Sequence, residues 1–152
     1  MKQYYYRLLI SLLLLCCGGF AHAESYRMVL VTGTQQLDNL QLSEKEIRKI
    51  FLGQVVIKDD NRITALINNT DPLLYQVFLQ KVAYMSANAY ERHLLSKVFR
   101  LGGNRPPVFV NNSSLVSALR SQAGTITYMW EETALKMPGV SIIGELWSGA
   151  IN

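Results

Sequence analysis

The amino-acid sequence predicts an α/β domain in which helices flank a mixed sheet. Three observations support this fold class. Short runs of β-branched and apolar residues alternate with longer segments of helical periodicity. Recognisable capping residues mark where several of the helices begin. The 152 residues contain no internal repeat, low-complexity tract or linker, so one domain is the simplest organisation.

The first 23 residues have the pattern of a cleavable export signal. Lys2 and Arg7 provide positive charge, residues 8–17 form an apolar run, and Ala21–Ala23 offers small residues before a cleavage site. We expect cleavage after Ala23, which leaves residues 24–152 as the exported domain without a stable membrane anchor. The alternative is an uncleaved anchor, but a membrane-spanning helix needs about 20 apolar residues, and this run is much shorter.

The composition of the exported domain excludes several function classes. Both cysteines lie within residues 1–23, so the domain has no disulfide, thiolate metal site or cysteine nucleophile. Loss of Lys2 and Arg7 leaves 13 basic against 11 acidic residues, and the net charge falls from +4 to +2. No run of Lys or Arg is present, so we expect no nucleic-acid binding.

The first predicted strand and helix lie before residue 54. Residues 26–31 (YRMVLV) are apolar and β-branched and are followed by turn residues, which is typical of a buried strand. Ser43 and Glu46 have the spacing of a capping box, so a helix is expected to begin there. Three apolar residues share one face of this helix before Gly53, which is expected to end it.

A second strand and a second helix start follow. Residues 55–61 are expected to form a short extended piece and a polar turn, and residues 62–67 (RITALI) a second buried strand. Asn68–Pro72 then predicts a helix start, because it combines a cap, Thr70 or Asp71, with a proline near the first helical position.

A third helix is expected to begin at Ser86. The segment before it continues apolar residues at helical spacing as far as Val82. The helix after Ser86 carries an apolar stripe from Tyr90 to Phe99, and Gly102-Gly103 is expected to end it.

The last third of the chain predicts three extended segments and one helix. Two consecutive prolines force an extended conformation into residues 108–110. Asn112 or Ser113 is expected to cap a helix that ends near a glycine. Residues 125–130 (TITYMW) and 140–143 then predict strands.

No constellation of side chains predicts catalysis. His93 is the only histidine after residue 23, and it lies in the middle of a predicted helix without a second histidine or a metal-binding motif. The serines are in capping positions, and there is no Gly-x-Ser-x-Gly motif. Asp59-Asp60 lies beside Lys58 in a predicted solvated turn. We therefore expect a non-enzymatic protein without a metal or cofactor.

The turn that follows the RITALI strand is the candidate ligand site. Backbone N–H groups and the dipole at a helix N-terminus favour anions, and Asn68, Asn69 and Thr70 add neutral hydrogen-bonding side chains. Asp71 favours the alternative, because a carboxylate at the cap satisfies the same N–H groups within the chain.

The order of motifs resembles the phosphate-type family of periplasmic solute-binding proteins, the binding components of phosphate ABC importers. The resemblance covers roughly residues 28–130. It rests on Leu42-Ser43, Ile47, Ile50-Phe51-Leu52-Gly53, the RITALI strand, Phe78-Leu79, Ala118 and the run Gly124-Thr125-Ile126-Thr127-Tyr128. The resemblance implies one lobe of the type 2 periplasmic-binding-protein fold, a periplasmic location and a role linked to transport or sensing.

The resemblance also implies a ligand, phosphate or another small oxyanion. The helix start that corresponds to the family's ligand turn makes Asn68, Asn69 and Thr70 the predicted ligand-binding residues. The family has two lobes that close on the anion, whereas this chain matches one, so a partner protein or a second copy would supply the other wall. The arginine and the Ser-Gly-Thr of the family's ligand turn are absent here, and only Thr70 carries over. These departures favour the alternative function, a protein-binding accessory subunit of an envelope complex, with Tyr26, Trp130 and Trp147 as candidate contact residues.

Overall fold

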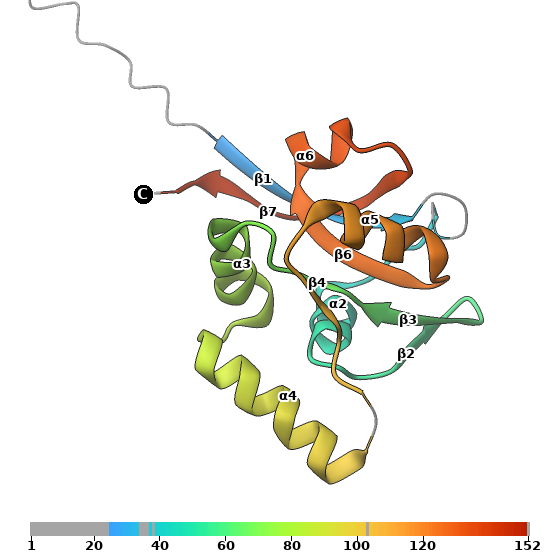
Figure 1. Ribbon diagram of the computed structural model, residues 1–152, viewed down its shortest axis with the longest axis vertical. Helices are drawn as coiled ribbons and strands as arrows, with labels where there is room; N and C mark the ends of the chain where they lie inside the picture. Colours follow the sequence, from blue (N-terminus) through green and yellow to red (C-terminus); the bar gives the residue numbers. More distant parts are fainter. Residues whose placement is uncertain (1–24, 34–36, 38, 103, 152) are drawn as a thin grey trace, which may run out of the picture.

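A computed structural model describes residues 25–33, 37, 39–102 and 104–151. The predicted export signal lies outside these residues. The described chain forms a five-stranded mixed sheet in the order β2-β3-β6-β1-β7, flanked by helices, with a separate two-stranded pair β4-β5 (Figure 1). The predicted α/β class with a mixed sheet flanked by helices is therefore confirmed.

The elements alternate along the chain as the sequence pattern indicates. The strands are β1 (Ser25–Gly33), β2 (Val56–Lys58), β3 (Asn61–Ala65), β4 (Ile67–Asn68), β5 (Val108–Phe109), β6 (Thr125–Trp130) and β7 (Val140–Ala150). The helices are α2 (Glu44–Phe51), α3 (Pro72–Phe78), α4 (Ala87–Leu101), α5 (Asn112–Ser121) and α6 (Glu131–Lys136), and the π-helix η1 (Leu79–Ala83) extends α3.

Strand β1 is in the interior of the sheet. It pairs antiparallel with β6 on one side and with β7 on the other. Strand β3 pairs parallel with β6 and antiparallel with β2 in a hairpin. The RITALI run is thus shared between two sheets, because its last residue belongs to β4, which pairs with β5.

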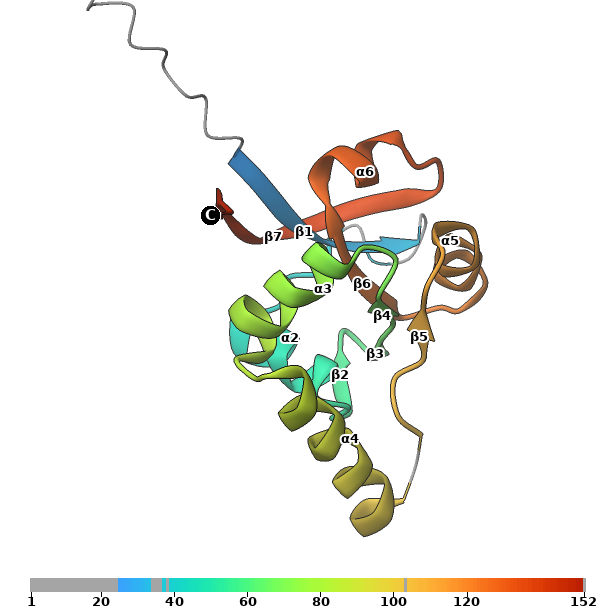
Figure 2. The same cartoon turned by 60° about the vertical axis from the view of Figure 1, so that its left-hand side comes forward.

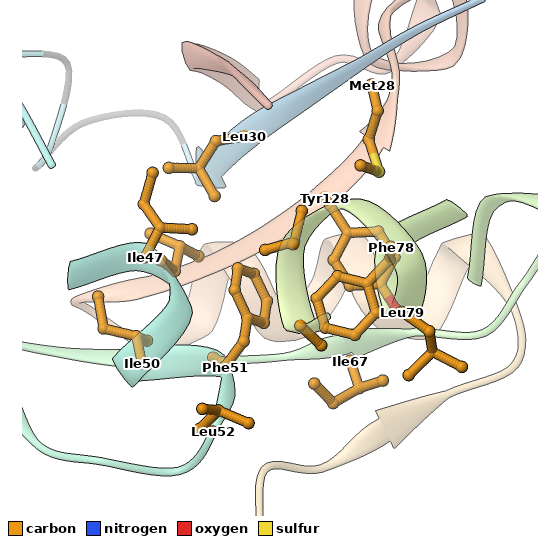
Figure 3. Packing of buried hydrophobic residues seen from close by; sticks show 14 of the residues in the cluster. Met28, Leu30, Ile47, Ile50, Phe51, Leu52, Ile67, Phe78, Leu79 and Tyr128 are labelled. Carbon is orange, nitrogen blue, oxygen red and sulfur yellow. The ribbon is translucent and has the colours of Figure 1, made fainter. Parts of the chain in front are cut away.

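Two hydrophobic cores lie on opposite faces of the sheet, because successive side chains of a strand point to opposite sides. Met28 and Leu30 of β1 enter the larger core, under α2, α3, η1 and α4, whereas Val29 and Val31 enter the smaller core under α5 and α6. In the larger core the rings of Phe78 and Tyr128 stack with centroids 4.1 Å apart (Figure 3).

The predicted helix starts are confirmed at three places. Ser43 and Glu46 form the capping box of α2, Asp71 caps α3, and Ser86 caps α4. The cap of α5 is Asn111, so the prediction of Asn112 or Ser113 was wrong by one or two residues. Asn111 is the cap because its backbone is extended and its side-chain oxygen accepts a hydrogen bond from the backbone N–H of Ser114.

Two further elements differ from the expectation. Helix α6 was not predicted, and β7 is much longer than residues 140–143. The pairing of β1 with β7 skips Ile143 and Leu146, which both pack against the larger core. At these two irregularities the strand bulges, so that Ile143 and Leu146 both face the core although they are three residues apart. Because the side chains no longer alternate strictly between the two faces, a search for a period of two misses most of β7.

Candidate functional site

The predicted ligand turn lies at the carboxyl end of β4, beside β6. Asn68 ends β4, and its side-chain Nδ2 donates to the backbone oxygen of Tyr128 in β6 at 2.9 Å. Asn69, Thr70 and Asp71 then lead into α3. Ligands of open α/β sheets commonly bind outside the carboxyl ends of the strands, so the turn occupies a suitable place in the fold.

Both ends of the Asn68 side-chain amide are bonded within the chain. The residue is only 1% exposed. Its Oδ1 accepts from the Thr70 backbone N–H at 3.0 Å and from the Thr70 hydroxyl at 2.8 Å. Its backbone oxygen accepts from the Tyr128 hydroxyl at 2.7 Å, and burial raises the pKa of that hydroxyl well above its ordinary range. Asn68 therefore connects β4, β6 and the turn.

The backbone N–H groups of the turn and of the first helical residues also have acceptors. Asn69 donates to the oxygen of Phe109 at 2.8 Å. One oxygen of the Asp71 carboxylate accepts from Leu73 and Leu74 at 2.8 and 3.3 Å. The other oxygen accepts from the indole N–H of Trp130 at 2.8 Å. The capped form of this helix start is thus the one that the structure shows, and ligand binding at Asn68, Asn69 and Thr70 stays a prediction.

A second group of side chains gathers at the same edge of the sheet. The rings of Tyr26 and Trp130 lie 5.3 Å apart at an interplanar angle of 53°. Beside them is an open hollow of about 380 Å³ whose walls include both rings. We call this surface the aromatic–carboxylate face and define it by Tyr26, Arg27, Trp130, Glu131 and Glu132.

Carboxylates dominate the charge of the aromatic–carboxylate face. The guanidinium of Arg27 contacts Glu131 at 2.9 Å and Glu145 at 3.5 Å, and the hydrogen bond to Glu131 raises the pKa of Arg27. Glu132 pairs with Lys136 one turn along α6, and this hydrogen bond lowers the pKa of the carboxyl. Since the one arginine of the face is already paired with carboxylates, the face offers an anion little attraction.

The sequence named two of these residues but missed the others. Tyr26 and Trp130 were candidate contact residues, and the structure brings them together. Trp147, the third candidate, does not line this hollow: the Lys81 ammonium lies 5.9 Å from its ring, although Trp147, like Trp130, packs partly buried against the larger core. Glu131 and Glu132 were missed because α6 was not predicted. Arg27 lay in the predicted first strand, but its carboxylate partners are more than 100 residues away in sequence, so nothing local marked it. Two acidic residues directly after a strand, in the first turn of a helix, were the available signal.

The residues considered for catalysis lie apart from this face. Asp59 and Asp60 form the exposed turn between β2 and β3, with positive φ angles of 49° and 60°. His93 lies in α4, and its Nε2 is buried without a hydrogen-bond partner among the described residues. Within the described ranges, no three His, Cys, Asp or Glu side chains are grouped so that they could hold a metal ion. Nor does this part of the chain contain a helix long and apolar enough to cross a membrane.

Comparison with known proteins identifies no relative. No family model, curated protein or solved structure matches the chain. The fold and the site define a mixed α/β domain with an aromatic and acidic face where the end of β6 lies beside the start of β1.

Proposed function

We propose that this protein is a non-enzymatic binding module of the cell envelope that recognises a protein partner, built on a single lobe of the type 2 periplasmic-binding-protein fold. The alternating elements, the parallel β3-β6 pair and the turn at the carboxyl end of β4 support this fold assignment. Residues 1–23 support an exported, periplasmic location.

One observation carries the choice of a protein over an oxyanion. The N–H groups expected to hold an anion are already bonded to Asn68, Asp71 and Phe109. An anion would have to displace the Asp71 carboxylate, which carries the same charge and is tethered to the helix it caps. It would also be placed near Glu131, with no arginine free of a carboxylate at the aromatic–carboxylate face.

The aromatic–carboxylate face has the composition of a protein contact surface. Tyrosine, tryptophan and arginine are the residues most enriched where binding energy concentrates in interfaces. Tyr26, Trp130 and Arg27 meet here at the rim of a hollow. The paired charges around them would orient a partner that carries basic residues.

Isothermal titration with phosphate separates the two functions. We expect residues 24–152 to give no heat with millimolar phosphate at low ionic strength, because the donors of the turn are occupied. Micromolar binding that is lost in Thr70→Ala would contradict the protein-binding proposal and favour an oxyanion receptor. Arg27→Gln serves as a matched control, because it removes a cation at the neighbouring face and leaves the turn intact.

Photo-crosslinking tests the partner directly. A photoreactive amino acid at Glu132, expressed in the native envelope, should give one discrete adduct, whereas the same amino acid at exposed Lys45 of α2 should give none. Glu131→Lys should abolish the adduct by reversing the charge of the face, with circular dichroism showing that the domain is still folded. Equal adducts at both positions would contradict the assignment of the aromatic–carboxylate face as the partner-binding surface.

A further inference from the structure

Helix α4 continues beyond the body of the domain. Among its described residues only Tyr90 and Leu94, both in the first half, are buried. In the second half, Leu95 is 42% exposed, Phe99 85% and Leu101 76%. Figures 1 and 2 both place the end of α4 at one extremity of the molecule, far from α6 and the start of β1. The predicted apolar stripe is therefore buried only where the helix lies against the core.

The exposed apolar side chains surround the end of the helix. Residues in an α-helix are rotated by about 100° each, so Phe99 and Leu101 point to nearly opposite sides. Leu101 follows the line of Tyr90 and Leu94 past the edge of the core, whereas Phe99 and Leu95 lie on the outer side. A helix that packs on one protein surface buries a single stripe. Exposure on both sides instead suits an environment that surrounds the helix end.

The charge around this helix end is uniformly positive. The segment from Arg92 to Arg105 contains four basic residues and no aspartate or glutamate. Glu91, just before it, pairs with Arg105 at 2.7 Å. Lys97 donates one hydrogen bond to the backbone oxygen of Gly53 and forms no ion pair with a carboxylate among the described residues. We call Leu95, Lys97, Phe99, Arg100 and Leu101 the α4 tip.

We propose that the α4 tip docks reversibly on a membrane surface rich in anionic lipid. Leu95, Phe99 and Leu101 enter the interface between headgroups and acyl chains, and Lys97 and Arg100 extend to the lipid phosphates. Apolar and aromatic side chains combined with Lys and Arg on a helix are typical of interfacial binding, in which hydrophobic burial and attraction to anionic lipid add together. A bilayer surrounds an inserted helix end on all sides, which suits the exposure pattern.

An exposed leucine elsewhere provides the contrast. Leu135 on α6 is 73% exposed, but it lies among Glu131, Glu132 and Lys136 without a second exposed apolar neighbour on its helix. Single exposed apolar residues are ordinary on protein surfaces. Leu135 therefore serves as the matched control for the tip.

Co-sedimentation with vesicles tests the proposal. Residues 24–152 should bind vesicles that contain phosphatidylglycerol, should bind pure phosphatidylcholine vesicles much more weakly, and should be released by high salt. Phe99→Ser with Leu101→Ser should weaken binding roughly tenfold or more, since it removes two inserting side chains. Lys97→Gln with Arg100→Gln should weaken it only on the anionic vesicles, and Leu135→Ser should leave it unchanged.

A site-specific probe provides an independent readout. The domain lacks cysteine, so Ser96→Cys allows one environment-sensitive dye at the tip, and Ser117→Cys on α5 allows one far from it. Only the dye at residue 96 should shift to the blue on phosphatidylglycerol vesicles. No binding, equal binding to neutral vesicles, or a shift at residue 117 as well would overturn the proposal and leave an acidic protein as the partner of the tip. None of these outcomes bears on the aromatic–carboxylate face, because the two surfaces share no residue.

Discussion

Asn68 shows at the scale of one residue how a polar side chain becomes part of a core. It joins three segments through its bonds to the Tyr128 backbone, the Tyr128 hydroxyl and Thr70. A buried amide is tolerated only when its hydrogen-bonding capacity is used, and here both ends of the amide have partners. Its type and place predicted a ligand contact, but its amide nitrogen and its backbone oxygen bond to Tyr128, which is 60 residues away in sequence.

Replacement of Asn68 should therefore affect stability. In Asn68→Ala, the buried Tyr128 carbonyl and the half-buried Thr70 hydroxyl lose their partner. A buried group left unpaired costs about 1–3 kcal/mol. Urea unfolding should show a loss of about 2–4 kcal/mol. Asn69→Ala is the control, because the bond of residue 69 to Phe109 uses the backbone and is kept. Equal stability of the two variants would contradict this role.

Glu46 predicts a dependence of stability on pH. The Ser43 backbone N–H and hydroxyl, with the Lys58 ammonium, hold its pKa at about 2, below the ordinary value of 4.5. A carboxyl with a depressed pKa in the folded state stabilises the fold above the unfolded pKa, and this contribution is lost as pH falls from 4.5 toward 2. Urea unfolding at pH values across that window should show a smaller loss in Glu46→Gln than in the wild type. Glu44 is also in the first turn of α2 but takes no part in the capping box, so Glu44→Gln should lose as much stability with falling pH as the wild type.

At the scale of elements, Gly124 determines how α5 connects to β6. Its φ of +74° is unfavourable for other residues, and a Cβ at this position would lie 2.4 Å from the backbone oxygen of Arg62. The atom that the Cβ would meet belongs to the backbone, so no side-chain movement can relieve the contact. The Gly-Thr-Ile-Thr-Tyr motif thus has a packing reason for its glycine, apart from any ligand.

Gly124→Ala should be destabilising for two reasons that add. The left-handed conformation costs a side chain about 1–2 kcal/mol, and the clash with Arg62 adds about 1–3 kcal/mol. Gly53→Ala isolates the first cost, because φ there is +72° and an added Cβ meets only side chains at 3.6 Å or more. Thermal unfolding should rank Gly124→Ala well below Gly53→Ala. The same melting temperature for both would show that the contact is relieved.

Elements with local signals were predictable, and elements that depend on distant pairing were not. The capping box of α2 involves Ser43 and Glu46, three residues apart, so the sequence displays it directly. Helix α6 has no side-chain cap, spans six residues and buries only Ala134. It lies in the connection that leads from the end of β6 at Trp130 to β7, which pairs with β1. Its position therefore depends on strand pairing between distant segments.

At the scale of the whole molecule, the two ends of the domain are joined by one strand pair. Ser25 lies opposite Ala150 and Gly33 opposite Val140, so β7 covers the full length of β1 (Figure 1). The segment after residue 140, which had no functional account from the sequence, is therefore an integral strand of the fold.

Removal of residues 140–151 should abolish cooperative unfolding. The deletion leaves one edge of β1 without a partner strand and exposes part of both cores. Small domains have little stability to lose. Near-ultraviolet circular dichroism during heating should show no sigmoidal transition. Ile142→Ser, which alters a half-exposed side chain and keeps the strand, should melt cooperatively. A cooperative transition in the deleted chain would contradict an essential role for β7.

The two proposed surfaces lie toward opposite extremities of the molecule. The α4 tip is at one end of the long axis, and the start of β1 and α6, which carry the aromatic–carboxylate face, lie toward the other (Figures 1 and 2). A domain docked on a membrane by the tip would thus present the aromatic–carboxylate face away from the lipid. Both surfaces could be occupied at the same time.

The sequence by itself determined what depends on near neighbours: the α/β class, three helix starts and the apolar faces of the strands. These follow from periodicity and capping, which act within a few residues. The tertiary structure alone decided that Asn68 and the second carboxylate oxygen of Asp71 bond to residues of β6, that Tyr26 meets Trp130, and that half of α4 leaves the core. Each depends on which distant segments pack together, since a donor is available to a ligand, or an apolar side chain to a membrane, only when no part of the fold occupies it.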